Sequence, residues 1–181
     1  MRRLAPPLAA CLTALLAGCG VVGALRVTDP EPKPAVVRDG EFELEIMSPR
    51  SEWGADQPIE VTATLRYLGT EDQVEIGGSG AGPIAFGVAE LGGTRRMDAL
   101  WQMDCAPHVL GPDDPIVARY TKSGGWAPDD PNIAFYEAFF ADPEFRLPAG
   151  RWQVEAWVRF GVGACDGRQV DTRASVILTV D

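Results

Sequence analysis

Strict alternation of apolar and polar residues constrains the fold of this chain more than any other feature. In EFELEIM, residues 41–47, three apolar side chains alternate with glutamates. The same period recurs in three further stretches: IEVTATLRY at 59–67, RWQVEAWVRF at 151–160 and ASVILTV at 174–180. Because successive side chains of a strand point to opposite faces, the alternation predicts half-buried strands of antiparallel sheets. No window of comparable length has a helical period, so we expect helices to be short or absent.

The turns between these stretches complete the predicted topology. Gly92 and Gly93 separate two strands, and the last two strands form a terminal hairpin. Strands are expected at 41–48, 58–68, 73–77, 83–91, 95–103, within 133–146, at 151–161 and at 172–180. The pattern predicts an all-β fold of about seven strands in two packed sheets, with a long inserted loop segment.

The segment RLPAGRW, residues 146–152, resembles the corner before the sixth strand of immunoglobulin-like sandwiches. Its Leu147, Gly150 and Trp152 match the L-x-x-G-x-aromatic spacing of that corner. A tyrosine usually holds the aromatic position, and the indole N–H of Trp152 can replace the tyrosine hydroxyl only as a donor. The resemblance implies an immunoglobulin-like antiparallel β-sandwich.

The strands around Gly92 and Gly93 also resemble a bacterial sandwich family that includes the intracellular proteinase inhibitors of bacilli. In that family a strand ends near an acid and a glycine turn, and the next strand carries a tryptophan; here these are Glu90 and Trp101. The match covers about a third of the domain, and an inhibitory function does not transfer on fold similarity.

The N-terminus has the features of an export signal. Two arginines precede an apolar run at 8–18, which is too short to span a membrane as a helix. The run ends in Leu16-Ala17-Gly18-Cys19, which resembles the lipobox of bacterial lipoproteins. That resemblance implies removal of residues 1–18 and acylation of Cys19, which would hold the chain on the outer side of the cell membrane or on the outer membrane. An ordinary secretory signal is the alternative.

The charge and the prolines predict how the domain is attached. Residues 19–40 contain alternating Pro30, Pro32 and Pro34, which favour an extended spacer, although a disordered leader also fits. The folded domain is then expected at 41–181. Without residues 1–18 the chain keeps 14 basic and 26 acidic side chains. Such an acidic surface repels nucleic acid and anionic lipid head groups, so the bilayer is contacted through the acylated Cys19.

Two cysteines remain for the folded domain. Cys11 leaves with the signal and Cys19 is lipidated, so Cys105 and Cys165 form an even pair in an oxidising compartment. We expect a structural disulfide, which would stabilise the fold by about 4 kcal/mol. A redox-active pair has little support because the C-x-x-C spacing is missing.

The residues available for catalysis are few. His108 is the single histidine, and Ser79 in GGSGAG lacks the G-x-S-x-G spacing of a nucleophile elbow. Cys105 and His108 have a C-x-x-H spacing, but a structural zinc needs four ligands. We therefore expect no enzymatic activity and no cofactor. A hydrolase is the weaker alternative, and it requires His108 to lie beside Ser79 or paired acids in a cleft.

Two similar acidic turns, GPDDP and APDDP, are weak candidates for a calcium site. Clustered carboxylates on loops suit calcium, but the D-x-D-x-D-G ladder is missing and solvated turns have the same composition. The four residues are Asp113, Asp114, Asp129 and Asp130.

The inserted segment 101–145 is rich in aromatic residues, which either fill the core or form a contact surface. The candidates for that surface are Trp126, Phe139 and Phe140. We therefore predict a membrane-anchored binding or interaction module with an envelope or secreted protein as partner. An inhibitor or chaperone-like factor for a secreted or envelope enzyme is the alternative.

Overall fold

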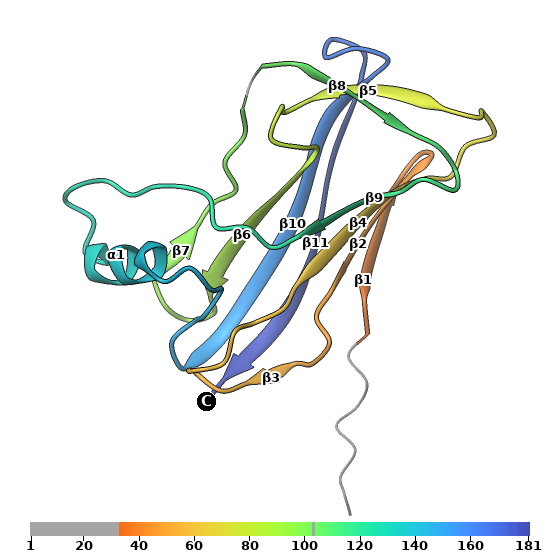
Figure 1. The fold of residues 1–181 in the computed structure, drawn as a ribbon. Helices are drawn as coiled ribbons and strands as arrows, with labels where there is room; N and C mark the ends of the chain where they lie inside the picture. Colours follow the sequence, from red (N-terminus) through yellow and green to blue (C-terminus); the bar gives the residue numbers. More distant parts are fainter. Residues whose placement is uncertain (1–32, 103) are drawn as a thin grey trace, which may run out of the picture.

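The computed structural model describes residues 33–102 and 104–181, which contain eleven strands and one short helix. Two sheets pack face to face around one apolar core, and the predicted all-β sandwich is confirmed (Figure 1). The predicted signal peptide at 1–18 and the predicted lipidation site, Cys19, lie outside the described residues.

The smaller sheet has the strand order β1-β2-β4-β9, and all its pairs are antiparallel. Its strands are β1 (Ala35–Asp39), β2 (Phe42–Met47), β4 (Thr62–Tyr67) and β9 (Ile116–Arg119). β1 pairs with β2 over its whole length, across a turn where Gly40 has a φ of +59°. The domain boundary predicted at residue 41 is therefore wrong. An edge strand such as β1, with most of its side chains exposed, shows no alternation that would reveal it.

The larger sheet is built on the predicted terminal hairpin. Its strands β10 (Gly150–Val162) and β11 (Arg168–Val180) pair along their whole length and extend through the sandwich (Figure 1). Four more strands adjoin β10 directly or through a neighbour, and one short strand adjoins β11. These are β5 (Val74–Gly78), β6 (Ile84–Glu90), β7 (Arg96–Met97) and β8 (Ala106–Leu110) on the β10 side, and β3 (Glu52–Trp53) beside β11.

The structure contains more strands than the alternation predicts. The additional strands are β1, β3, β8 and β9, and the strand expected at 95–103 is reduced to the two residues of β7. All five are five residues long or shorter and lie at sheet edges. Main-chain pairing with a neighbour forms such strands without a long apolar stripe, so their sequences carry a weak signal.

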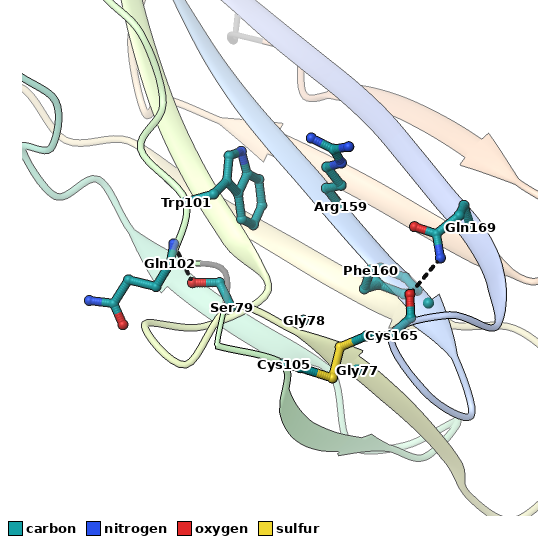
Figure 2. A pocket seen from close by; sticks show the side chains of 11 residues that line it. Gly77, Gly78, Ser79, Trp101, Gln102, Cys105, Arg159, Phe160, Cys165 and Gln169 are labelled. Carbon is teal, nitrogen blue, oxygen red and sulfur yellow. Dashed lines mark hydrogen bonds between the residues drawn. A yellow bond between two sulfur atoms is a disulfide. The ribbon is translucent and has the colours of Figure 1, made fainter.

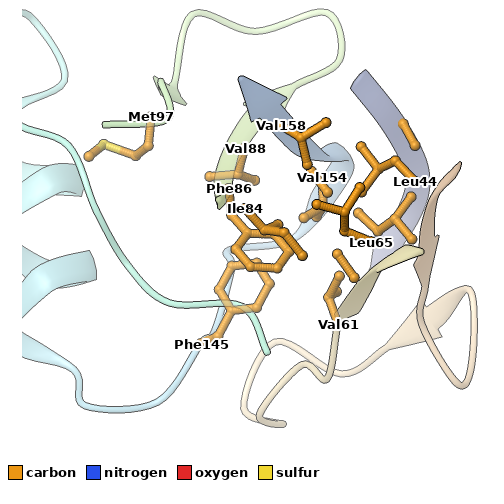
Figure 3. Packing of buried hydrophobic residues seen from close by; sticks show 14 of the residues in the cluster. Leu44, Val61, Leu65, Ile84, Phe86, Val88, Met97, Phe145, Val154 and Val158 are labelled. Atoms are coloured by element: carbon orange, nitrogen blue, oxygen red, sulfur yellow. The ribbon is translucent and has the colours of Figure 1, made fainter. Parts of the chain in front are cut away.

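The inward side chains of the alternating strands fill the core. On β10, every second residue from Trp152 to Phe160 is at most 2% exposed. Leu44 and Leu65, which are paired across β2 and β4, face this row from the smaller sheet (Figure 3). Removal of these apolar surfaces from water is the main force that holds the two sheets together.

Helix α1 (Ile133–Ala141) occupies most of the segment 133–146, so the strand expected there is wrong. Its apolar residues do not alternate: Phe135 and Phe139 are four positions apart, lie on one helical face and pack on the core. The ammonium of Lys122 donates to the carbonyls of Phe139 and of the C-cap residue. A cation at the C-terminal end of a helix donates hydrogen bonds to carbonyls that have no partner within the helix. It also interacts favourably with the negative end of the helix dipole.

The corner before β10 is closed by the indole N–H of Trp152, which donates to the Pro148 carbonyl at 2.9 Å. Gly150 turns the chain here with a φ of +146°, which favours glycine. The guanidinium of Arg95 lies over the Trp152 ring, 4.9 Å from its centroid, and pairs with Glu90. The indole N–H of Trp152 thus donates the hydrogen bond that closes this corner.

Carboxylates paired with arginines make the stability depend on pH. Hydrogen bonds from Arg95 lower the pKa of Glu90, and a hydrogen bond from Arg38, with a second from Arg66, lowers the pKa of Glu43. The unfolded chain then takes up protons at a higher pH than the folded chain. The stabilisation is complete above the ordinary value of 4.5, and we expect it to be lost as the pH falls through the folded pKa values.

Urea unfolding between about pH 6 and pH 3 measures this loss as a fall in the free energy of unfolding. Glu90→Gln removes one of these groups, so the free energy of unfolding of this variant should depend less steeply on pH than that of the wild type. A free energy that stays constant across this range in the wild type contradicts the prediction.

Candidate binding site

Two tryptophans lie together on the outer face of the larger sheet. Trp157 projects outward from β10, because its neighbours Ala156 and Val158 point into the core. Trp101 follows β7, and its ring meets the ring of Trp157 edge to face with centroids 5.4 Å apart. We call these two residues, with the two hollows that they line, the tryptophan face.

The ring of Trp157 is held by residues of the neighbouring strand β11. Its indole N–H donates to the carboxylate of Asp171 at 2.6 Å. The guanidinium of Arg173, directly opposite in the strand register, lies 3.9 Å from the ring centroid. Arg173 is itself placed by Glu155, 3.3 Å away. These contacts fix the side chain before any ligand arrives, which lowers the entropy lost on binding.

The first hollow borders Trp101 and has a volume of about 150 Å³ (Figure 2). Its polar lining comes from Ser79, Gln102, Arg159 and Gln169, and the two cysteines also line it. Among the described residues around this hollow, none is acidic. The hollow therefore offers several hydrogen-bond donors, and the one charged residue in its described lining, Arg159, has the carboxylate of Asp171 3.9 Å away.

The predicted disulfide between Cys105 and Cys165 is present, with an Sγ–Sγ distance of 2.08 Å. It joins the segment before β8 to the turn between β10 and β11 (Figure 2). Glycines allow this close approach: a Cβ atom on Gly77 would lie 2.6 Å from the Cys165 nitrogen, and one on Gly161 would lie 2.0 Å from the Ala164 oxygen. The disulfide thus anchors the wall of the first hollow.

The second hollow borders Trp157 and has a volume of about 390 Å³. Gly87 and Ala89 of β6 line it, and their small size leaves space above the sheet. Its polar walls come from β10, β11 and the end of β7, through Gln153, Glu155, Arg173, Arg96 and Asp98. The volume falls within the range of about 300–1,000 Å³ that small-molecule sites occupy.

The structure brings His108 and Ser79 together, but without the geometry of a nucleophile and its base. A ring nitrogen of His108 lies 2.9 Å from the main-chain oxygen of Ser79, and the hydroxyl does not take part in this contact. The hydroxyl accepts hydrogen bonds from the main-chain nitrogens of Ala81 and Gln102, both at 3.3 Å. The serine is 4% exposed. Both residues therefore hold the 79–82 turn in place.

The two acidic turns lie on different sides of the molecule. Asp113 and Asp114 are in the β8–β9 turn, whereas Asp129 and Asp130 precede α1 (Figure 1). Asp130 accepts from the main-chain nitrogen of Asn132 at 2.8 Å, which makes it a turn residue. In the part of the chain that the structure describes, no group of three His, Cys, Asp or Glu residues could hold a metal ion. The four aspartates that were weak candidates for a calcium site therefore do not form one shared cluster.

The aromatic insertion is divided between core and surface. Phe139 is 4% exposed, so the expectation that it contributes to a contact surface is wrong: it packs edge to face on Phe145 in the core. Phe140 is half-buried. Trp126 is 37% exposed and stacks on Tyr136 and Phe140. Trp126 alone of the three candidates keeps a large accessible surface.

The tryptophan face is the site that reasoning from the sequence missed, and one signal could have revealed it. In RWQVEAWVRF the apolar residues that point to one side of the strand are buried. Trp157 stands at one of the alternate positions, where the other side chains are polar and point outward. A large aromatic ring at such a position is exposed to solvent unless a partner covers it. Its contact with Trp101 could not be inferred, because the two lie far apart in the sequence.

The comparison with protein-family models gives no match, and the comparison with curated proteins gives none. None of the helices described by the structure is long and apolar enough to cross a membrane. The fold and the tryptophan face are therefore the basis for a functional proposal.

Proposed function

We propose that this protein is an extracytoplasmic lipoprotein whose β-sandwich is a non-enzymatic binding module, and that the tryptophan face is its binding site. The observation that carries the proposal is the packed pair of Trp101 and Trp157 with a hollow beside each ring. Tryptophan is enriched among the residues that dominate binding energy, and concave sites bury most of a ligand.

Support for the location comes from the sequence and from the disulfide. Leu16-Ala17-Gly18-Cys19 resembles a lipobox after a signal-like apolar run. Disulfides such as Cys105–Cys165 persist in oxidising compartments and are rare in the cytosol. A lipid anchor would leave the acidic domain in the aqueous phase outside that membrane.

The anchor is tested by replacing Cys19 with serine. Mass spectrometry of the wild-type membrane fraction should find a mature chain that begins at lipid-modified Cys19. The Cys19→Ser variant should lose the lipid mass, and any of its chains from which residues 1–18 have been removed should leave the washed membrane, because the acidic domain itself has no strong attraction to a bilayer. A mature wild-type chain without the lipid mass, or a cleaved Cys19→Ser chain that stays in the membrane at the wild-type level, contradicts the anchor.

The binding module is tested by photo-crosslinking in cells that produce the full-length protein. Benzoylphenylalanine in place of Gln153, in the second hollow, should form adducts with the bound partner. The matched control places it at Glu137, which is exposed on α1 near Trp126. Adducts at 153 alone support the tryptophan face. Adducts at 137 alone contradict that site and favour the inhibitor-like alternative, in which the aromatic insertion makes the contact.

A further inference from the structure

We propose that the tryptophan face binds a neutral oligosaccharide chain, with sugar units in both hollows. This inference rests on the proposed function, since it names the ligand class of the same site. It follows from the charge, the hydrogen-bonding groups, the aromatic surfaces and the shape of the face.

The charges of the face cancel locally. Each arginine here has an acidic neighbour: the N–O distances are 2.5 Å for Arg96–Asp98, 3.3 Å for Arg173–Glu155 and 3.9 Å for Arg159–Asp171. The rest of the chain is strongly acidic, with a net charge of −10 overall. A face without net charge favours neither a polyanion nor a polycation, and this argues for a neutral polar ligand.

The hydrogen-bonding groups suit hydroxyls. A sugar hydroxyl both donates and accepts, and a paired arginine and carboxylate present both functions side by side. The arginines of the three pairs remain half-exposed or more, so they can contact a ligand without breaking their pairs. Gln153 in one hollow and Gln102 in the other add amides that donate and accept. Such planar side chains can bind two neighbouring hydroxyls at once.

The aromatic rings provide the apolar part of the site. The face of an indole is electron-rich, and it attracts the weakly positive C–H groups on the flat side of a sugar ring. Trp101 and Trp157 line different hollows, and both side chains are half-buried. Arg173 covers one face of the Trp157 ring, so a sugar ring would stack on the parts of the two rings that border the hollows.

The shape argues for a chain rather than a single sugar. The hollows of about 150 and 390 Å³ border two rings that are in contact, so a ligand that fills both must pass over the tryptophan pair. The disulfide and the long β10–β11 hairpin hold the rings in place. A rigid site of this kind loses little entropy when an extended ligand binds.

The test uses the full-length chain in a detergent without a sugar head group. Maltohexaose, cellohexaose and the hexamer of N-acetylglucosamine are the probes, and binding is measured by calorimetry and by tryptophan fluorescence. We expect at least one of them to bind with a Kd on the order of 0.1 mM. Hexagalacturonate, a hexaglutamate peptide and a hexalysine peptide test for charged ligands, and we expect weaker binding of all three.

Variants link any binding to the face. Trp157→Ala should weaken binding about tenfold, whereas Trp126→Ala, which removes an exposed ring near α1, should leave the Kd unchanged. If Trp157→Ala fails to fold, Gln102→Ala and Gln153→Ala provide the test, because each removes a polar side chain that lines one of the hollows. Each of these variants should weaken binding about threefold. Circular dichroism verifies the fold of every variant.

The inference is overturned if none of the neutral hexasaccharides binds at 10 mM, which is about a hundredfold the expected Kd. It is also overturned if a charged probe binds more tightly than all of them, or if the variants of the face bind as well as the wild type. If the photo-crosslinker at position 153 forms adducts with a protein and no saccharide binds, the oligosaccharide is rejected as the ligand. The proposal that the tryptophan face is a binding site then still holds. Adducts at 137 alone would reject the proposed site itself.

Discussion

Replacement of Trp152 by alanine is expected to lower the free energy of unfolding by about 4 kcal/mol, one of the largest effects of any single change. The side chain is fully buried, and Phe135 stacks on it with ring centroids 5.7 Å apart. Its N–H closes the corner by bonding to Pro148, and Arg95 covers one of its faces. Alanine would leave a cavity and an unpaired carbonyl at the start of the longest hairpin. Urea unfolding followed by circular dichroism measures the loss.

Two matched variants give this prediction its control. Trp152→Phe keeps an aromatic ring but loses the hydrogen bond, so its cost should be clearly smaller. Trp157→Ala changes the same residue type on the same strand, on the side that faces solvent, and should cost about 1 kcal/mol or less. Equal losses for Trp152→Ala and Trp157→Ala would show that the corner tryptophan does not anchor the core.

Removal of the disulfide is the second large effect. The double variant Cys105→Ser/Cys165→Ser is expected to be less stable by about 4 kcal/mol, because the bond closes a loop between residues 60 positions apart. Most of this loss arises in the unfolded chain, which gains freedom when the loop opens. The measurement is the midpoint of thermal unfolding, with the free energy taken from urea unfolding.

Reduction of the wild type gives the control for the disulfide. In a strong reductant its stability should fall to that of the double variant, whereas the double variant itself should not respond. The reduced wild type and the oxidised wild type should show the same far-ultraviolet circular dichroism below their transitions. Equal stability of the oxidised wild type and the double variant would contradict the structural role of the bond.

The strands with strict alternation were predictable because burial on one side of a sheet imposes a period of two. Phe42, Leu44 and Ile46 are at most 2% exposed, as EFELEIM predicts. Glu43 points outward as expected, yet Arg38 and Arg66 cover it, which the pattern alone does not reveal. The long terminal hairpin was visible for the same reason.

Other elements were not predicted, because they do not bury one face of a long strand and therefore show no alternation of apolar and polar residues. β1 is an exposed edge strand, and β8 carries Pro107 at a sheet edge, so neither has a clear apolar stripe. The helix at 133–141 contains five aromatic or branched apolar residues, a composition that also suits a strand. Its docking on the core and the contact of Lys122 with its last carbonyls favour the helix.

The candidate site was hidden for a related reason. Trp157 was detectable as a ring in the polar phase of β10, but its partner Trp101 belongs to a different segment. The first hollow forms because Gly77 and Gly161 let the disulfide turn approach β5 and β10. Phe139 and Trp126 looked equivalent in the sequence, and burial alone separated them.

The sequence by itself determined the sheet-rich class, the inward faces of the long strands and the pairing of the two cysteines. Each of these follows from local periodicity, short spacing or simple counting. The tertiary structure alone decided the strand order, the helix over the core and the meeting of Trp101 with Trp157. These features depend on contacts between distant segments, whose free energy appears only when the chain has folded.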